Sequence, residues 1–201
     1  MTSVDVRSFA ANSEKDPLEQ EGATSPVERL DADMRHVLSV HAQMGGKPIE
    51  ALRTPEARAQ PTLDMALRRI LRDSHDDLGI DMEMRLIPGP SEEIRARVYT
   101  PRTEVNGARP LILYFHPGAF VLGDVDHYDA TPRTLAQRTG AIVVSSHYRQ
   151  APEHRFPAAH EDAFAAWHWV MEHADSLGGD PGRVAIVGEG SGANLAVNVA
   201  L

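Results

Sequence analysis

Three continuous apolar runs constrain the fold more than any other feature of this sequence. They cover residues 111–115, 141–144 and 184–187. Strands with continuous apolar runs are typical of parallel sheets that helices cover on both faces. Helical patterns separate the runs, at about 130–138 and 158–174. This alternation predicts an α/β fold with an open, mostly parallel sheet, flanking helices and right-handed crossovers.

The sequence as a whole divides into three parts. Residues 1–25 mix polar residues and glycine without periodicity, which predicts a disordered tail. Residues 26–78 contain two helical patterns and are expected to form a helical cap segment. From Gly79 the apolar period shifts toward two, which predicts a pair of antiparallel strands. Residues 79–201 are therefore expected to form the main domain.

The charge balance and the lack of cysteine exclude several classes of function. Acidic residues outnumber basic ones, and the formal net charge of −9 argues against nucleic acid or an anionic membrane surface as a partner. Without cysteine, the chain has no disulfides, zinc–thiolate sites or cysteine nucleophiles. The apolar runs are too short to span a bilayer, and residues 1–16 carry charges where a signal peptide needs an apolar stretch. We therefore expect a cytoplasmic protein with no membrane span.

The residues that directly follow the apolar runs are candidates for a functional site. In open α/β sheets, ligands bind beyond the carboxyl ends of the strands. His116-Pro117-Gly118-Ala119-Phe120 follows the first run, and Gly188-Glu189-Gly190-Ser191-Gly192 follows the last. Small residues there let backbone N–H groups face a ligand, as an oxyanion hole requires. Two alternatives stay open: the first segment is only a turn, or the second binds phosphate at a helix N-terminus.

Taken together, the motifs resemble those of the hormone-sensitive-lipase-like branch of the α/β-hydrolases, over about residues 31–201. In that family a His-Gly-Gly-Gly-aromatic loop supplies the oxyanion hole, and residues 116–120 match it. A Tyr-Arg-Leu-Ala-Pro-Glu-His-x-Phe-Pro-Ala segment follows, matched by residues 148–158. The nucleophile elbow, Gly-Asp/Glu-Ser-Ala-Gly-Gly-Asn-Leu-Ala, is matched in frame by residues 188–196. The resemblance implies an incomplete α/β-hydrolase fold, truncated after the elbow, with residues 79–201 as the N-terminal part of its domain.

The elbow of this sequence departs from the family pattern at the position that matters for chemistry. In a G-x-S-x-G elbow the serine nucleophile has glycines two residues before and two residues after it. Gly188 and Gly192 occupy those offsets, so Gly190 stands at the nucleophile position and the serine is absent. The neighbouring Ser191 is an alternative nucleophile, although its side chain is expected to point elsewhere.

The oxyanion loop departs from the pattern as well. Pro117 replaces a glycine and removes one N–H, and Ala119 replaces another glycine and adds a Cβ. The resemblance implies that the N–H groups of Gly118, Ala119 and Ser191 form the oxyanion hole. His116 and Glu189 are the motif residues that accompany these donors.

The family carries the acid and the histidine of its triad downstream of the elbow, and neither is present in these 201 residues. The upstream His116, His147 and His154 are expected to organise loops through hydrogen bonds rather than to act as a base. No metal and no cofactor are expected. Loss of both serine and histidine predicts a fall in turnover on the order of a millionfold.

Three functions remain compatible with the sequence. The first is a carboxylic ester hydrolase of the esterase or lipase kind, with a small acyl ester as substrate, impaired or inactive as this chain. The second is a non-catalytic binding or interaction module that retains the hydrolase scaffold. A nucleotide-binding domain ranks last, because no Gly-Lys-Ser/Thr motif occurs. The final strand, 184–187, is expected to lie at an unpaired edge of the sheet and to cause self-association.

Overall fold

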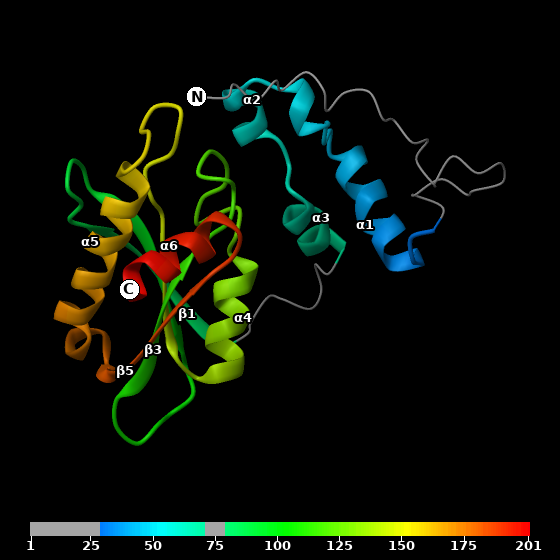
Figure 1. The fold of residues 1–201 in the computed structure, drawn as a ribbon. Coiled ribbons are helices and arrows are strands. Elements are labelled where there is room, and N and C mark those ends of the chain that lie inside the picture. The colour runs from blue at the N-terminus through cyan, green and yellow to red at the C-terminus, as the bar shows by residue number, and fades with distance from the viewer. Residues whose placement is uncertain (1–28, 71–78) are drawn as a thin grey trace, which may run out of the picture.

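The computed structural model describes residues 29–70 and 79–201, shown in Figure 1. The predicted tail, residues 1–25, lies outside the described residues. The helices are α1 (Ala32–Gln43), α2 (Thr54–Ala59), α3 (Leu63–Ile70), α4 (Ala130–Thr139), α5 (Ala158–His173) and α6 (Ser191–Ala200), with short 3₁₀ turns at Ile49–Ala51 and Asp175–Leu177. The strands are β1 (Ile80–Ile87), β2 (Ile94–Pro101), β3 (Arg109–Phe115), β4 (Ile142–Ser146) and β5 (Gly179–Gly188).

The five strands form one mixed sheet in the order β1-β2-β4-β3-β5. β3 pairs in parallel with both β4 and β5, whereas β1 and β2 form an antiparallel pair at the other edge. The predicted α/β fold with a mostly parallel central region is confirmed. β5 begins at Gly179, five residues before the predicted run, because Gly179 already pairs with Arg109 across a register shift.

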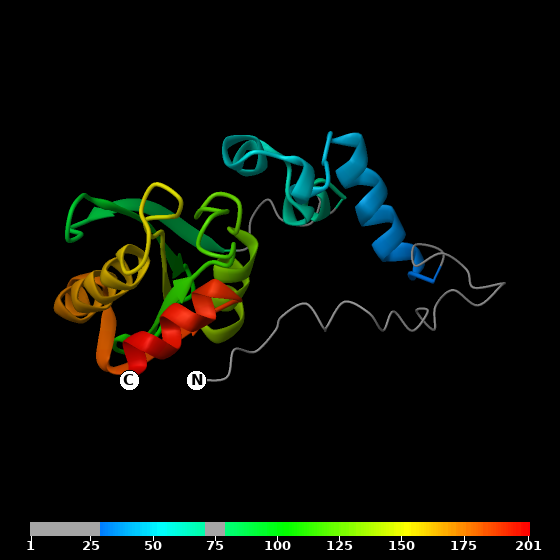
Figure 2. The same cartoon turned by 45° about the horizontal axis from the view of Figure 1, so that its top comes forward.

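Helices cover both faces of the sheet, as Figure 2 shows. On one face α5 and α6 pack against alternate residues of β3 and β4, among them Leu113 and Val144. On the other face α4 packs against the intervening residues, among them Tyr114 and Val143. All five residues of β4 are buried. This two-sided burial is the physical reason that the strands are apolar along their whole length.

The helical segment, residues 29–70, lies beside the sheet domain rather than in its core (Figure 1). α1 begins at Ala32, where the Asp31 side chain accepts a hydrogen bond of 2.8 Å from the N–H of Met34. Both predicted helices of this segment are present as α1 and α3. α2 was missed, because a helix of six residues is too short to show an apolar period. That the segment forms a cap stays a prediction.

Candidate active site

The elbow is a tight turn between the end of β5 and the start of α6. Gly190 has φ 52° and ψ −117°, a backbone conformation that favours glycine. The Gly192 N–H donates to the Glu189 carbonyl at 2.8 Å, and the Ala193 N–H donates to the Gly190 carbonyl at 3.1 Å. The helix that follows starts at Ser191.

The three glycines of the elbow meet different surroundings. A Cβ at Gly188 would lie 2.2 Å from the carbonyl oxygen of Gly192. A Cβ at Gly192 would lie 2.1 Å from the carbonyl oxygen of Phe115, so close backbone packing requires glycine at both positions. A Cβ at Gly190 would meet only the Pro117 side chain, at 3.6 Å, which is an ordinary contact. Position 190 thus has room for a side chain, and that side chain would face the loop that follows β3.

The loop after β3 is tightly wound. Gly118, Ala119 and Phe120 all have positive φ values, of 135°, 53° and 62°. The Gly118 carbonyl accepts hydrogen bonds from the N–H groups of Val121 (2.9 Å) and Leu122 (2.8 Å). A Cβ at Gly118 would lie 1.8 Å from the Leu122 carbonyl oxygen, so this position requires glycine. Positive φ at two non-glycine residues is strain of the kind that gathers at functional sites.

Three backbone N–H groups near the elbow are available to a ligand. Within the described residues, the N–H groups of Gly118 and Ala119 donate to no acceptor. Ser191 is the first residue of α6, and an N–H in the first turn of a helix has no acceptor within that helix. The structure therefore brings the predicted donors to the same end of the sheet, on the loops that follow β3 and β5.

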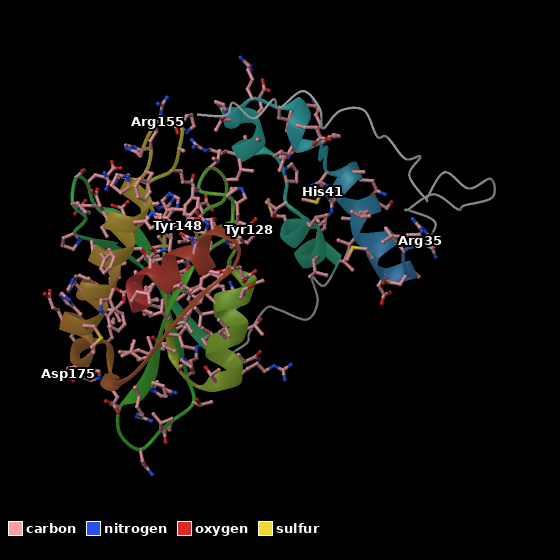
Figure 3. The ribbon with its side chains drawn as sticks, viewed as in Figure 1. Arg35, His41, Tyr128, Tyr148, Arg155 and Asp175 are labelled. Carbon is pink, nitrogen blue, oxygen red and sulfur yellow. The ribbon has the colours of Figure 1, made fainter. Side chains whose placement is uncertain are left out.

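Tyr148 connects these two loops. Its hydroxyl donates to the His116 carbonyl at 2.9 Å and lies 3.3 Å from the Ser191 Oγ. Tyr148 is fully buried, and burial raises the pKa of its hydroxyl to about 12. Figure 3 labels Tyr148 beside α6. The buried Ser191 side chain is therefore turned toward Tyr148.

His116 and His147 form a hydrogen-bonded pair beneath the loop. His116 Nε2 lies 3.1 Å from His147 Nδ1, and His116 Nδ1 lies 2.7 Å from the Pro117 carbonyl oxygen. The His116 ring stacks on Tyr148 with the ring centroids 4.5 Å apart. Burial lowers the pKa of His116 to about 4, and burial also lowers the pKa of His147. Both rings are therefore neutral at pH 7.

Glu189 and His154, which also belong to the motifs, have different surroundings. Glu189 accepts a 2.8 Å hydrogen bond from the Tyr114 hydroxyl, and burial together with this bond raises the pKa of Tyr114. His154 is more exposed, and its Nε2 lies 3.8 Å from a Glu92 carboxylate oxygen. Glu189 thus connects the elbow to β3, while His154 connects its own segment to the turn between β1 and β2.

A cavity of about 480 Å³ lies between the helical segment and the loop after β3. Its wall is mostly apolar and includes Leu63, Leu122 and Tyr128, together with His41 and Arg58. Sequence patterns gave no signal for this cavity, because its walls come from segments about sixty residues apart. Among residues 29–70 and 79–201, no group of three His, Asp or Glu side chains is arranged to hold a metal ion. In the same residues, no helix is long and apolar enough to cross a membrane.

Comparison with known proteins extends these observations. A sequence profile of the α/β-hydrolase fold matches residues 112–201. The esterase LipI of Mycobacterium tuberculosis is 45% identical over 140 residues, which are 67% of this chain and 43% of that protein. An ethyl acetate hydrolase of Pseudomonas putida is 36% identical over 154 residues, 76% of this chain and 48% of that protein. The chain thus spans less than half of either relative.

Solved structures give the same result. A hyperthermophilic esterase from the archaeon Pyrobaculum calidifontis superposes with a TM-score of 0.66 at 38% identity, over 83% of this chain and 51% of that one. A thermostable carboxylesterase cloned from a metagenomic library superposes with a TM-score of 0.64, also at 38% identity, over 73% of this chain and 48% of that one. Fold and loops together define an α/β-hydrolase. Within that class, the chain is similar to proteins of the esterase and lipase kind, in agreement with the motifs that its sequence carries.

Proposed function

We propose that this chain is a carboxylic ester hydrolase scaffold whose nucleophile position is occupied by glycine, and that ester hydrolysis is impaired in it. The observation that carries the proposal is the geometry of Gly190. Its backbone is folded as a strained elbow, and the position faces Pro117 with room for a side chain. An elbow of this shape presents a hydroxyl to a bound ester in the family. Glycine has no hydroxyl to present.

The remaining groups support binding without covalent catalysis. The N–H groups of Gly118, Ala119 and Ser191 are the proposed donors to the carbonyl oxygen of a small acyl ester. The Ser191 Oγ is a poor substitute for the missing nucleophile, because it is buried against the Tyr148 hydroxyl. No acyl-enzyme then forms at position 190, so the covalent route to ester hydrolysis is lost.

The apolar cavity supports the proposed class of ligand. It borders Leu122 and Gly123, just beyond the residues that carry the proposed donors. An ester with its carbonyl at the donors can place an apolar group in this space. The apolar part of the cavity wall supports a small ester with an apolar group as the ligand.

Hydrolysis of p-nitrophenyl acetate tests the proposal. We expect the purified chain to release p-nitrophenol at a rate indistinguishable from the uncatalysed background. A rate that saturates with substrate and disappears in the Ser191→Ala variant would show that Ser191 is a working nucleophile. An active esterase of the same family, assayed alongside, confirms that the assay detects turnover.

The second candidate is a non-catalytic interaction module, and the edge of the sheet favours it. β5 pairs with β3 on one side, and among the described residues no strand pairs with it on the other. An unpaired edge offers N–H and C=O groups to another chain. Val197 of the adjacent α6 is also 58% exposed. We propose that the 201-residue chain associates with itself through this edge.

Sedimentation velocity over a range of protein concentrations tests self-association. We expect a sedimentation coefficient that rises with concentration, as it does for a reversible dimer or larger oligomer. A single monomeric species at all concentrations, with one sharp thermal unfolding transition, would contradict the proposal.

A further inference from the structure

Arg58, on the short helix α2, reaches across to the sheet domain with four hydrogen bonds. Its Nε donates to the Val121 carbonyl at 2.7 Å, and its Nη2 donates to the Ala151 carbonyl at 2.8 Å. Nη1 and Nη2 also donate to the two carboxylate oxygens of Glu153, at 3.0 and 2.9 Å. A guanidinium has five N–H donors, so four of them are used in these contacts.

The two carbonyl acceptors belong to segments that hold the loop after β3. The Val121 N–H bonds to the Gly118 carbonyl at 2.9 Å, so Arg58 contacts the turn that begins at Gly118. The Ala151 N–H bonds to the Phe120 carbonyl at 2.9 Å, so Arg58 also contacts the segment that supports the same loop from the other side. One planar side chain thereby bridges two backbone segments that come together at Phe120.

The pairing with Glu153 gives the contact a defined geometry. A bidentate Arg–carboxylate pair fixes the guanidinium plane, and lysine cannot reproduce such a fork. The Arg58 side chain is 30% exposed and that of Glu153 is 51% exposed, so the pair is open to solvent on one side. The hydrogen bonds from Arg58 to the carbonyls of Val121 and Ala151 are more buried than this pair, and they connect Arg58 to the loop after β3.

The position of Arg58 between two cavities adds a second observation. It lines the 480 Å³ apolar cavity beside Leu122 and Tyr128. It also lines a cavity of about 370 Å³ beside His147 and Glu153. Arg58 therefore lies in the wall of both cavities.

We propose that Arg58 is a positioning residue that docks the helical segment onto the loop after β3 and holds the Gly118 turn in shape. What that loop binds rests on the function proposed above, whereas the docking itself does not. The helical segment is then coupled to the oxyanion donors through one side chain. Release of Arg58 loosens the donors and opens the apolar cavity in a single movement.

Hydrogen exchange of the Val121 and Leu122 amides, measured by NMR, tests the proposal. Both N–H groups bond to the Gly118 carbonyl and report on the turn. We expect Arg58→Met to speed their exchange by about tenfold or more, because charge-assisted hydrogen bonds are lost. The amide of Leu113, in the central strand β3, should be unchanged. Arg53→Met, at the start of the same helix where the side chain is 85% exposed, is the matched control and should leave all three amides unchanged.

Two further measurements separate positioning from loss of stability. Glu153→Gln should give a smaller acceleration at the same two amides, and it keeps the test available if Arg58→Met does not fold. Adding methylguanidinium to Arg58→Ala should restore protection of Val121 and Leu122. Wild-type exchange at these amides in Arg58→Met and Glu153→Gln, or equal acceleration in Arg53→Met, would overturn the proposal. None of these readouts depends on ester hydrolysis, so failure of the proposed function would leave them intact.

Discussion

The sheet domain and the helical segment are held in place by different forces. In the sheet domain, β3 and β4 are buried on both faces between α4 and the pair α5 and α6. In the described part of the helical segment, α1 has no buried residue, and Leu63 and Leu67 of α3 are 47% and 41% exposed, although the small Ala66 of α3 is buried. The segment instead contacts the sheet domain through the polar fork of Arg58. Apolar burial therefore determines the scaffold, whereas directional hydrogen bonds hold the segment against the loop after β3.

The largest expected effect is in the core of the sheet. Leu113 is fully buried in β3, and Leu113→Ala removes its methyl groups and leaves a cavity. We expect the free energy of unfolding to fall by about 2–5 kcal/mol. Urea denaturation followed by circular dichroism measures the change. A loss below about 1 kcal/mol would mean that the core of the sheet domain is loosely packed, which would contradict its contrast with the helical segment.

The pH dependence of stability tests the buried histidine pair. The pKa of His116 is about 4 in the folded chain and about 6.5 when it is unfolded, so the unfolded state binds more protons between these values. Stability should therefore fall as the pH drops from about 6.5 to 4, by on the order of 3 kcal/mol. Denaturation at a series of pH values should show this slope, and His116→Gln should flatten it. The same slope in the variant would assign the effect to other groups.

The elbow should show a smaller effect that depends on position. A Cβ at Gly192 would lie 2.1 Å from the Phe115 carbonyl oxygen, so Gly192→Ala must displace backbone. We expect a loss of about 1–3 kcal/mol, as for an overpacked core. Gly182→Ala is the control, because its Cβ would approach only the Asp180 side chain, at 3.2 Å. Thermal unfolding of the two variants tests the packing of the elbow. An equal change in melting temperature for Gly192→Ala and Gly182→Ala would contradict the close contact at Gly192.

The smallest expected effect is in the helical segment. Leu67→Ala makes the same chemical change as Leu113→Ala at a position that is 41% exposed. We expect a change in unfolding free energy of less than about 0.5 kcal/mol. A loss comparable to that of Leu113→Ala would show that the segment shares the core and would break the comparison.

The scaffold was predictable from the sequence, whereas the contacts between distant segments were not. The buried strands were predictable because burial on both faces requires continuous apolar runs, as at Val143 and Val144. The frame of the elbow was predictable because Gly188 and Gly192 are required by backbone packing within a few residues. Their spacing alone is the basis for the prediction that Gly190 stands at the nucleophile position.

The contacts that complete the site left no pattern in the sequence. Tyr148 reaches the Ser191 Oγ across 43 positions, and Arg58 reaches Val121 across 63. Single polar contacts between distant segments have no periodicity, and only the folded chain brings the partners together. Tyr148 could have been suspected because it opens the motif of residues 148–158, but its partner could not. Arg58 lies outside every motif of the sequence.

The most direct test of the central claim, that position 190 is a nucleophile position without a nucleophile, is covalent trapping. The chain is incubated with a p-nitrophenyl phosphonate ester, which modifies activated serines, and its intact mass is then measured. We predict that the mass stays that of the unmodified chain, because Gly190 has no hydroxyl and the Ser191 Oγ is buried against Tyr148. A stoichiometric adduct that peptide mapping places on Ser191 would contradict the account.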